Sequence, residues 1–294
     1  MKRTLLQAWG RIRFNACLRM SRYRALSKLF EWCQRGQATR EEIEHALKLG
    51  PALSNVAASY IAPIYWLDPH APLTAVPQNG TIFFLNCSGT TFAVTADHVY
   101  RAYLAKKQAA PHIVCKIGNM TVDPENRCID RNEDLDIVTF RITDDEIHQI
   151  GKLALTGSQQ KWPPAPPWPG RGVFFAAYPG VAHILHDGHI IDFGIYAANT
   201  IATQVTDELI TCEFERERWV DHLGLGLPEE GYNLSGISGC PLLTLVDHRG
   251  ILSWRLAGVT YGAPRCAGEM ILVRRADFIR EDGRLTPFSV RQRF

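Results

Sequence analysis

Residues 236–241 read Gly-Ile-Ser-Gly-Cys-Pro, and they are the most informative stretch of this chain of 294 residues. Glycine tolerates backbone conformations that other residues resist, so Gly236 and Gly239 allow a sharp turn on both sides of the serine. Such a turn exposes the Ser238 hydroxyl and aims nearby amide N–H groups at an atom on which negative charge develops. The stretch therefore indicates a nucleophilic serine, although glycine and serine are common in loops of every kind.

A histidine and an aspartate lie upstream of this serine, each next to a run of residues typical of a buried strand. His98 follows the aromatic, β-branched and small residues of 89–96, and Asp136 opens a second such run at 136–142. A carboxylate at the mouth of a buried strand is costly unless it is hydrogen-bonded, and an imidazole N–H is a suitable donor. We therefore expect His98 and Asp136 to pair.

The three segments resemble those of the trypsin-like (chymotrypsin-fold) serine peptidases of the intracellular and bacterial type. Residues 94–98 (Val-Thr-Ala-Asp-His) resemble the histidine motif of the family, residues 136–140 (Asp-Ile-Val-Thr-Phe) its aspartate motif, and residues 236–241 its serine motif. The order His, Asp, Ser along the chain differs from the orders of the subtilisins and the α/β-hydrolases. The resemblance extends over residues 59–282, which is most of the chain.

The resemblance implies a serine endopeptidase and a role for each residue of the triad. Ser238 would attack the scissile carbonyl, His98 would transfer the proton, and Asp136 would orient the imidazole. The amides of Gly236 and Ser238 would form the oxyanion hole. The expected substrate is a polypeptide, and we expect neither a metal nor an organic cofactor.

Asp134 is the alternative to Asp136, because both residues would face the same side of an extended strand. The family pattern has apolar residues first and fourth after the aspartate, and Ile137 and Phe140 meet it for Asp136. If Asp134 were the aspartate of the motif, the charged Asp136 would fall within the strand pattern. We therefore expect Asp136 in the site and Asp134 in a solvated loop.

The resemblance also implies the residues that bind substrate. The floor of the primary pocket corresponds to the tyrosine six residues before the serine, and its walls to a strand and a glycine further along the chain. The predicted lining is Tyr232, Thr260, Tyr261, Gly262 and Gly268. None of these is acidic, so we expect a neutral, small-to-medium apolar side chain at the cleavage site. The alternative is that Tyr232 itself fills the pocket.

Ile237 departs from the pattern of the digestive members of the family. Those enzymes have an aspartate immediately before the nucleophile, which pairs with an N-terminus freed by cleavage. Ile237 cannot make that pair. We therefore expect no activation by this route, and a regulatory partner is the hypothesis that replaces it.

The eight cysteines are scattered and contain no Cys-x-x-Cys pair. In a chain of this size we expect reduced thiols that pack as small core hydrophobes, and hence a reducing compartment, the cytoplasm. Arg11 and Arg13 interrupt the apolar run near the start, so we expect no secretory signal. No uninterrupted apolar stretch is long enough to span a membrane.

Many short candidate strands with turn signals between them predict an all-β core. The family resemblance implies two six-stranded antiparallel β-barrels with the triad between them. We expect residues 59–155 to form the first barrel, with His98 and Asp136, and residues 156–294 to form a Pro-rich linker and the second barrel, with Ser238. The predicted strands are 60–67, 81–87, 91–95, 113–117, 136–142, 173–178, 201–206, 209–214, 241–246, 256–261 and 270–274, with a hairpin at 184–191.

Three local features complete these predictions. A short helix is expected after His98, and Thr143 and Glu146 predict a capping box on another. The Pro-rich segment 162–170 is expected to be a stiff connection between the halves, and a ligand for a proline-reading domain is the alternative. His183, His186 and His189 are interpreted as surface residues of the hairpin rather than as metal ligands, because alternate positions face opposite sides.

Residues 1–58 are predicted to be a basic, helical N-terminal extension. Residues 1–40 contain ten Lys/Arg and one Glu, a net charge of +9, and the remainder carries 22 basic and 29 acidic residues, a net charge of −7. We interpret residues 1–50 as a helical appendage that packs on the acidic body of the protein or on a second copy of the chain. A surface for a regulatory protein is the other interpretation. Membrane-surface contact and an organelle transit peptide are alternatives, and so is docking to nucleic acid, which we do not expect.

Two classes of function follow from these observations. An active endopeptidase is expected, because every residue of the triad is present. The alternative is a catalytically silent trypsin-like fold that acts as a peptide-binding or scaffold module, because a fold alone does not confer activity.

Overall fold

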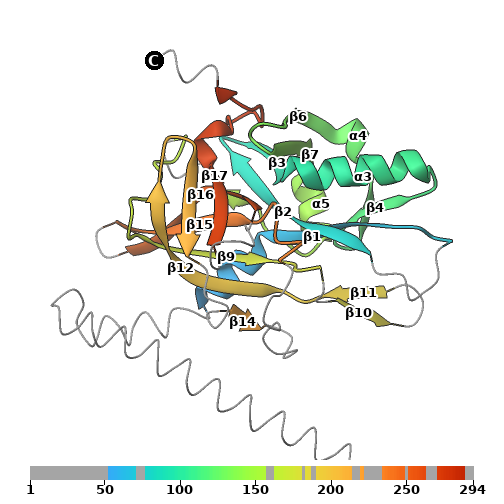
Figure 1. The fold of residues 1–294 in the computed structure, drawn as a ribbon, viewed down its shortest axis with the longest axis horizontal. Coiled ribbons are helices and arrows are strands. Elements are labelled where there is room, and N and C mark those ends of the chain that lie inside the picture. The colour runs from blue at the N-terminus through green and yellow to red at the C-terminus, as the bar shows by residue number, and fades with distance from the viewer. Residues whose placement is uncertain are drawn as a thin grey trace, which may run out of the picture. The chain divides into compact units, whose positions relative to one another are not determined.

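The computed structural model describes residues 52–70, 77–156, 162–180, 183–186, 190–213, 219–221, 234–248, 251–262 and 270–288. From Leu53 onward these residues belong to one compact unit of the chain. Residues 52–59 form a helix, and most of the others form strands (Figure 1). The predictions for residues 1–51, and those for Tyr232, Gly268 and His189, lie outside the described residues.

The first sheet carries the His98 and Asp136 segments and occupies the right of Figure 1. Its strands lie in the order β5-β4-β1-β2-β3-β7-β6, each antiparallel to the next, and β8 pairs with β2 in parallel. They are β1 (Ile61–Leu67), β2 (Gln78–Cys87), β3 (Thr90–Thr95), β4 (Val114–Ile117), β5 (Met120–Val122), β6 (Cys128–Asn132), β7 (Ile137–Arg141) and β8 (Leu155–Thr156). The helices α3 (Asp97–Ala109), α4 (Pro124–Arg127) and α5 (Asp144–Gln149) accompany this sheet.

The second sheet closes on itself, because β12 pairs with β13 as well as with β9. The closed ring is β9-β12-β13-β17-β16-β15, and β14 (Trp219–Asp221) pairs with β12 beside it. Its members are β9 (Gly172–Ala177), β12 (Tyr196–Val205), β13 (Leu209–Glu213), β15 (Pro241–His248), β16 (Ile251–Gly262) and β17 (Met270–Arg275). The strands β10 (His183–His186) and β11 (Ile190–Phe193) form the predicted hairpin, and a 3-10 turn, η2 (Ala276–Phe278), follows β17.

The all-β prediction is confirmed, and so is a six-stranded barrel in the second half. The first sheet is a half-barrel instead, since no pairing among the described strands joins β5 to β6. Pro124 begins α4 between these two strands. Proline has no N–H for a ladder bond, so the connection turns into a short helix rather than continuing the sheet.

Strand β2 is buried on both faces, which explains its continuous apolar run. Ile82 and Phe84 pack into one core cluster, and Phe83 and Leu85 pack into another. Successive side chains of a strand point to opposite faces, so one strand serves both clusters. The second cluster also contains Phe174 of β9 and other residues of the barrel. This shared core joins the half-barrel to the barrel.

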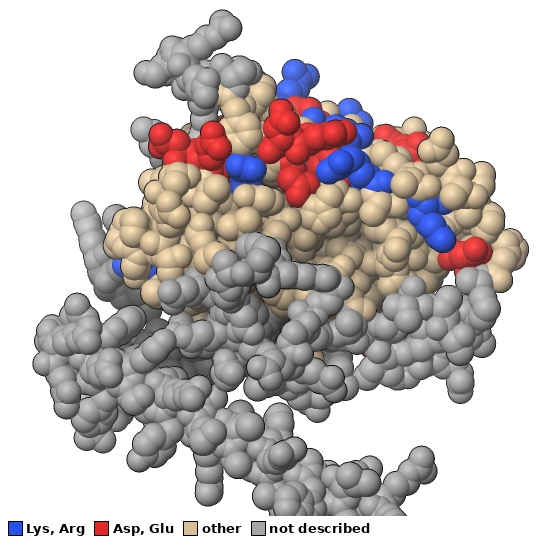
Figure 2. All heavy atoms as spheres, viewed as in Figure 1, with Lys and Arg blue, Asp and Glu red and all other residues tan. Residues whose placement is uncertain are grey.

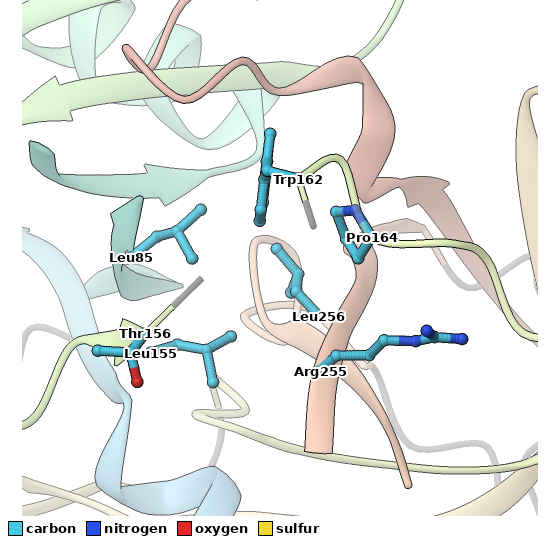
Figure 3. A pocket seen from close by; sticks show the side chains of 7 residues that line it. All are labelled: Leu85, Leu155, Thr156, Trp162, Pro164, Arg255 and Leu256. Carbon is cyan, nitrogen blue, oxygen red and sulfur yellow. The ribbon is translucent and has the colours of Figure 1, made fainter. Parts of the chain in front are cut away.

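The Pro-rich connection packs on the body at a shallow hollow (Figure 3). The indole N–H of Trp162 donates to the carbonyl oxygen of Ile279 at 2.8 Å, and Pro164 is buried. Arg255 extends away from the leucines that line the hollow (Figure 3). The lining residues are Leu85, Leu155, Thr156, Trp162, Pro164, Arg255 and Leu256, and they include none of the predicted triad. The hollow therefore belongs to the packing of the linker.

The predicted capping box of α5 is present, with Thr143 and Glu146 each bonded to the backbone of the other. The five cysteines in the described part of the chain are free, and four of them are buried. No helix among the described residues is long and apolar enough to cross a membrane. Acidic and basic side chains lie side by side along the upper edge of the molecule in Figure 2.

Candidate active site

His98 is held at the junction between strand β3 and helix α3. The strand ends at Thr95, and the helix begins at Asp97, so His98 lies in its first turn. The short helix expected after His98 is therefore a helix of 13 residues that includes it. A histidine between a buried strand and a helix has little backbone freedom, which suits a side chain that must be positioned accurately.

Asp97, the residue before His98, anchors this first turn from inside the protein. Its carboxylate is fully buried. It accepts a hydrogen bond from Nε of Arg131 at 2.9 Å and forms an ion pair with Nε of Arg101 at 2.9 Å. Arg131 belongs to β6, so the pair ties α3 to the sheet. Two arginines thus neutralise the buried carboxylate, and both are partly exposed, Arg101 by 47% and Arg131 by 34%.

Asp136 binds His98 at two points. One carboxylate oxygen lies 2.7 Å from the ring nitrogen Nδ1, and the other accepts the backbone N–H of His98 at 2.8 Å. The His98 side chain is 41% exposed and the Asp136 side chain 15% exposed. The ring therefore faces solvent while its carboxylate partner is largely screened from water.

Asp136 adopts a backbone conformation that is uncommon for a residue other than glycine, with φ of +55°. It stands in the turn directly before β7, and its own N–H donates to the carbonyl of Glu133. Aspartate is among the residues that tolerate this region, although it costs free energy. Asp134, two residues earlier, is exposed. The structure thus brings Asp136, and not Asp134, to His98.

The Ser238 loop leaves two amide N–H groups free. The amides of Ile237, Gly239 and Cys240 donate to the carbonyls of Leu234, Thr260 and Ile237, respectively. Neither Gly236 nor Ser238 donates its amide N–H to another described residue. Buried amides are almost always paired, so two unpaired donors one residue apart form a ready site for an oxyanion. The sequence predicts an oxyanion role for these two amides, and that role stays a prediction.

Gly236 and Gly239 both adopt the left-handed conformation that the sequence predicts for this turn, with φ of +98° and +90°. At Gly239 a side chain is also excluded by space. A Cβ there would lie 2.1 Å from the Thr81 carbonyl oxygen, 2.1 Å from Thr95 Oγ1 and 3.0 Å from the Ala96 nitrogen. The residue after Ser238 therefore touches the chain two residues before His98.

The Ser238 side chain is nearly buried in this loop, and the residue is 9% exposed. Within the described residues, no hydrogen bond joins its hydroxyl to the His98 ring. Hydrogen bonds of this kind are often long in the absence of substrate, and a serine hydroxyl moves by rotation about one bond. The loops that carry the two residues are in contact through Gly239 and Ala96.

The predicted substrate-binding residues that are described have different environments. Thr260 is fully buried, and its backbone N–H and carbonyl are both bonded to the Ser238 loop, at Cys240 and Gly239. Its hydroxyl accepts the Cys240 thiol at 3.2 Å. Tyr261 and Gly262 are partly exposed at the end of β16. Thr260 thus supports the loop, whereas Tyr261 and Gly262 have partly exposed side chains or backbone at the strand end.

Tyr261 stacks on a buried cation. The guanidinium of Arg274 lies 4.8 Å from its ring centroid. Burial raises the pKa of Tyr261, and the Arg274 cation opposes that shift. Burial likewise lowers the pKa of Arg274 from its ordinary value. Arg274 is not among the residues predicted from the sequence, because nothing in its sequence context indicates this contact with Tyr261.

No group of three or more histidine, cysteine or acidic residues in the described part of the chain is arranged to hold a metal ion. The candidate site is therefore built from one histidine, one aspartate, one serine and backbone amides. Such a set supports proton transfer and stabilisation of an oxyanion.

Comparison with known proteins finds no matching protein-family model and no matching curated protein. A structure from a study of aromatic interactions in the coupled folding and binding of the intrinsically disordered Sesbania mosaic virus VPg protein aligns at 13% identity. It covers 73% of this chain and 85% of that chain, with a TM-score of 0.38. A similarity of this size carries no argument about function, so the site must be judged by its own geometry.

Proposed function

We propose that this protein is a serine endopeptidase of the trypsin-like type, built from a half-barrel and a closed barrel, in which His98, Asp136 and Ser238 form the triad. The observation that carries the proposal is the double contact of Asp136 with the ring and the backbone of His98. A carboxylate on Nδ1 holds the tautomer in which Nε2 is free to accept a proton. A histidine that served only to pack the core would be buried, whereas the His98 side chain is 41% exposed.

The chemistry of each step follows from these contacts. Ser238 Oγ attacks the carbonyl carbon of a peptide bond and passes its proton to His98 Nε2. The tetrahedral oxyanion is bound by the free amides of Gly236 and Ser238, each worth about 3 kcal/mol in comparable sites. His98 then protonates the leaving amine, and water hydrolyses the acyl-enzyme by the reverse proton path. Asp136 stabilises the imidazolium in both halves of the reaction.

Tyr261 and Gly262, together with Tyr232 and Gly268 outside the described residues, are proposed to bind the side chain at the cleavage site. The absence of an acidic residue among them favours a neutral, small-to-medium apolar side chain. Thr260 contributes indirectly, because its backbone N–H and carbonyl are hydrogen-bonded to the Ser238 loop. A library of peptide substrates that varies this side chain tests the preference, and a preference for Arg or Lys would contradict it.

The activity is tested with a fluorophosphonate probe, which reacts with activated serines, on the full chain. We expect labelling of the wild type, no labelling of Ser238→Ala or His98→Ala, and roughly 10⁴-fold slower labelling of Asp136→Asn, because that change disturbs the imidazole tautomer. Ser253→Ala, on strand β16 outside this loop, is the control and keeps wild-type labelling.

The outcome separates the peptidase from the alternative, a catalytically silent peptide-binding or scaffold module. An unlabelled wild type with an intact fold, or equal labelling of Ser238→Ala, rejects the peptidase and favours the silent module. The partners proposed for residues 1–50, a regulatory protein or a second copy, are tested by comparing the full chain with a variant that starts at residue 51.

A further inference from the structure

We propose that Thr81, a buried residue of strand β2 in the first sheet, is a positioning residue for the oxyanion site on the Ser238 loop. The oxyanion role in this inference rests on the proposed peptidase function, whereas the hydrogen bonds of Thr81 do not depend on it. Thr81 is fully buried and uses its hydroxyl, its amide and its carbonyl in hydrogen bonds. It touches no reacting atom, so its effect would pass through the loop.

Four consecutive carbonyl groups of the loop, from Ser235 to Ser238, each accept a hydrogen bond. The carbonyl of Ser235 accepts the amide of Gly180 at 2.7 Å, and that of Ile237 accepts the amide of Cys240 at 3.1 Å. The other two carbonyls accept hydrogen bonds from Thr81. Its hydroxyl donates to the Gly236 carbonyl at 2.8 Å, and its amide donates to the Ser238 carbonyl at 3.0 Å.

These bonds fix the direction of the free amides. In a trans peptide the C=O and the N–H point in opposite directions within one plane. The Ser235 carbonyl therefore orients the Gly236 N–H, and the Ile237 carbonyl orients the Ser238 N–H. Thr81 holds the plane between these two, which contains the Gly236 carbonyl, and the plane that follows them, which contains the Ser238 carbonyl. With all four planes held, neither free N–H can rotate away without breaking a bond.

The Thr81 hydroxyl is itself held in place, since it accepts the Tyr178 amide at 2.9 Å. Its single proton is therefore directed to the Gly236 carbonyl. The Thr95 hydroxyl, also buried, donates to the Thr81 carbonyl at 2.6 Å. Tyr178 follows β9 of the barrel, so one hydroxyl connects the half-barrel, the barrel and the loop. This hydroxyl therefore ties the position of the loop to both sheets.

The experiment compares three variants of the full chain. Thr81→Val removes the hydroxyl at nearly constant volume, and Thr81→Ser keeps it. Thr139→Val is the matched control, because Thr139 is also fully buried and donates its hydroxyl to a glycine carbonyl, that of Gly283 at 2.6 Å, away from the loop. Thr81→Ala replaces Thr81→Val if the latter does not fold.

The first measurement is the second-order rate constant for labelling by the fluorophosphonate. We expect it to fall about 10- to 100-fold in Thr81→Val, less than the about 10²- to 10³-fold loss for deleting a whole donor. Thr81→Ser and Thr139→Val should stay within about threefold of wild type, since neither disturbs the loop. Equal rates for Thr81→Val and wild type, or an equal fall in Thr139→Val, would overturn the proposal.

The second measurement does not depend on activity. The amide resonances of Gly236 and Ser238 are followed by ¹⁵N–¹H NMR in the same variants. We expect both to shift in Thr81→Val and to remain in place in Thr139→Val and Thr81→Ser. Unchanged resonances in Thr81→Val would reject the positioning role even if the protein is a peptidase. A shift in a protein that the probe never labels would reject the peptidase and leave the loop geometry supported.

Discussion

Arg274, on the last strand of the barrel, donates from Nε to the carbonyl oxygen of Leu135 in the half-barrel at 3.1 Å. A second nitrogen of the same guanidinium lies 3.2 Å from the carbonyl of Asp134. The residue is 7% exposed, and no carboxylate among the described residues pairs with it. Arg274 therefore clamps the turn directly before Asp136, and its charge is solvated by carbonyls and by the ring of Tyr261.

Arg274→Lys is predicted to destabilise the fold because lysine cannot reproduce the fork of donors. At least one buried carbonyl would lose its partner, which costs about 1–3 kcal/mol. Urea unfolding at neutral pH measures the difference. Arg280→Lys is the control, since Arg280 is exposed, and it should change the free energy of unfolding by less than about 0.5 kcal/mol. Equal stability of Arg274→Lys and wild type would show that the clamp contributes nothing.

The sequence was sufficient for the strands with continuous apolar or β-branched runs, such as β2 and β3, because burial on both faces leaves a strong pattern. The short strands β5, β6, β8 and β14 were not predicted, since they have mixed composition and exist through pairing with neighbours. The pairing of His98 with Asp136, and the two positive-φ glycines, follow from short motifs. Thr81 and Arg274 were not predicted, because their roles depend on contacts between residues that lie far apart in sequence.

Gly239→Ala is predicted to be severely destabilising. The added Cβ would overlap the Thr81 carbonyl oxygen and Thr95 Oγ1, both at 2.1 Å, and alanine is strained at φ of +90°. Strain of this kind alone costs about 1–3 kcal/mol, and the overlap adds to it. Thermal unfolding followed by circular dichroism measures the loss. Gly262→Ala is the matched control, because a Cβ at Gly262 meets no atom within 4 Å. A Gly239→Ala protein as stable as Gly262→Ala would contradict the tight packing of the loop.

Glu146 predicts a dependence of stability on pH. Its pKa is lowered from 4.5 to about 2, mainly by the hydrogen bonds from Arg127 at 2.7 and 3.0 Å. The folded state therefore binds fewer protons than the unfolded state, so this contribution is present above the unfolded value and is lost as the pH falls from 4.5 toward 2.

Glu146→Gln tests that contribution because glutamine preserves the capping box. After allowance for solvent screening, we expect the variant to be less stable than wild type by about 1 kcal/mol at neutral pH. The difference should shrink as the pH is lowered from about 5 to about 2. Urea unfolding at several pH values measures it. A stability gap between Glu146→Gln and wild type that stays constant in acid would contradict the assignment.

The cysteines of the core predict a pattern of thiol reactivity. Burial raises the pKa of Cys115, Cys212 and Cys240 to about 12, so the thiolate that reacts with alkylating agents is scarce in the folded protein. With iodoacetamide at about pH 8, these three residues should stay unlabelled in native buffer and become labelled in urea. Cys128 is only partly buried and should react first among the described cysteines. Peptide mass spectrometry after timed quenching gives the order. Rapid labelling of Cys240 in the native protein would mean that the Ser238 loop opens, because its sulfur lies beneath that loop against Thr260.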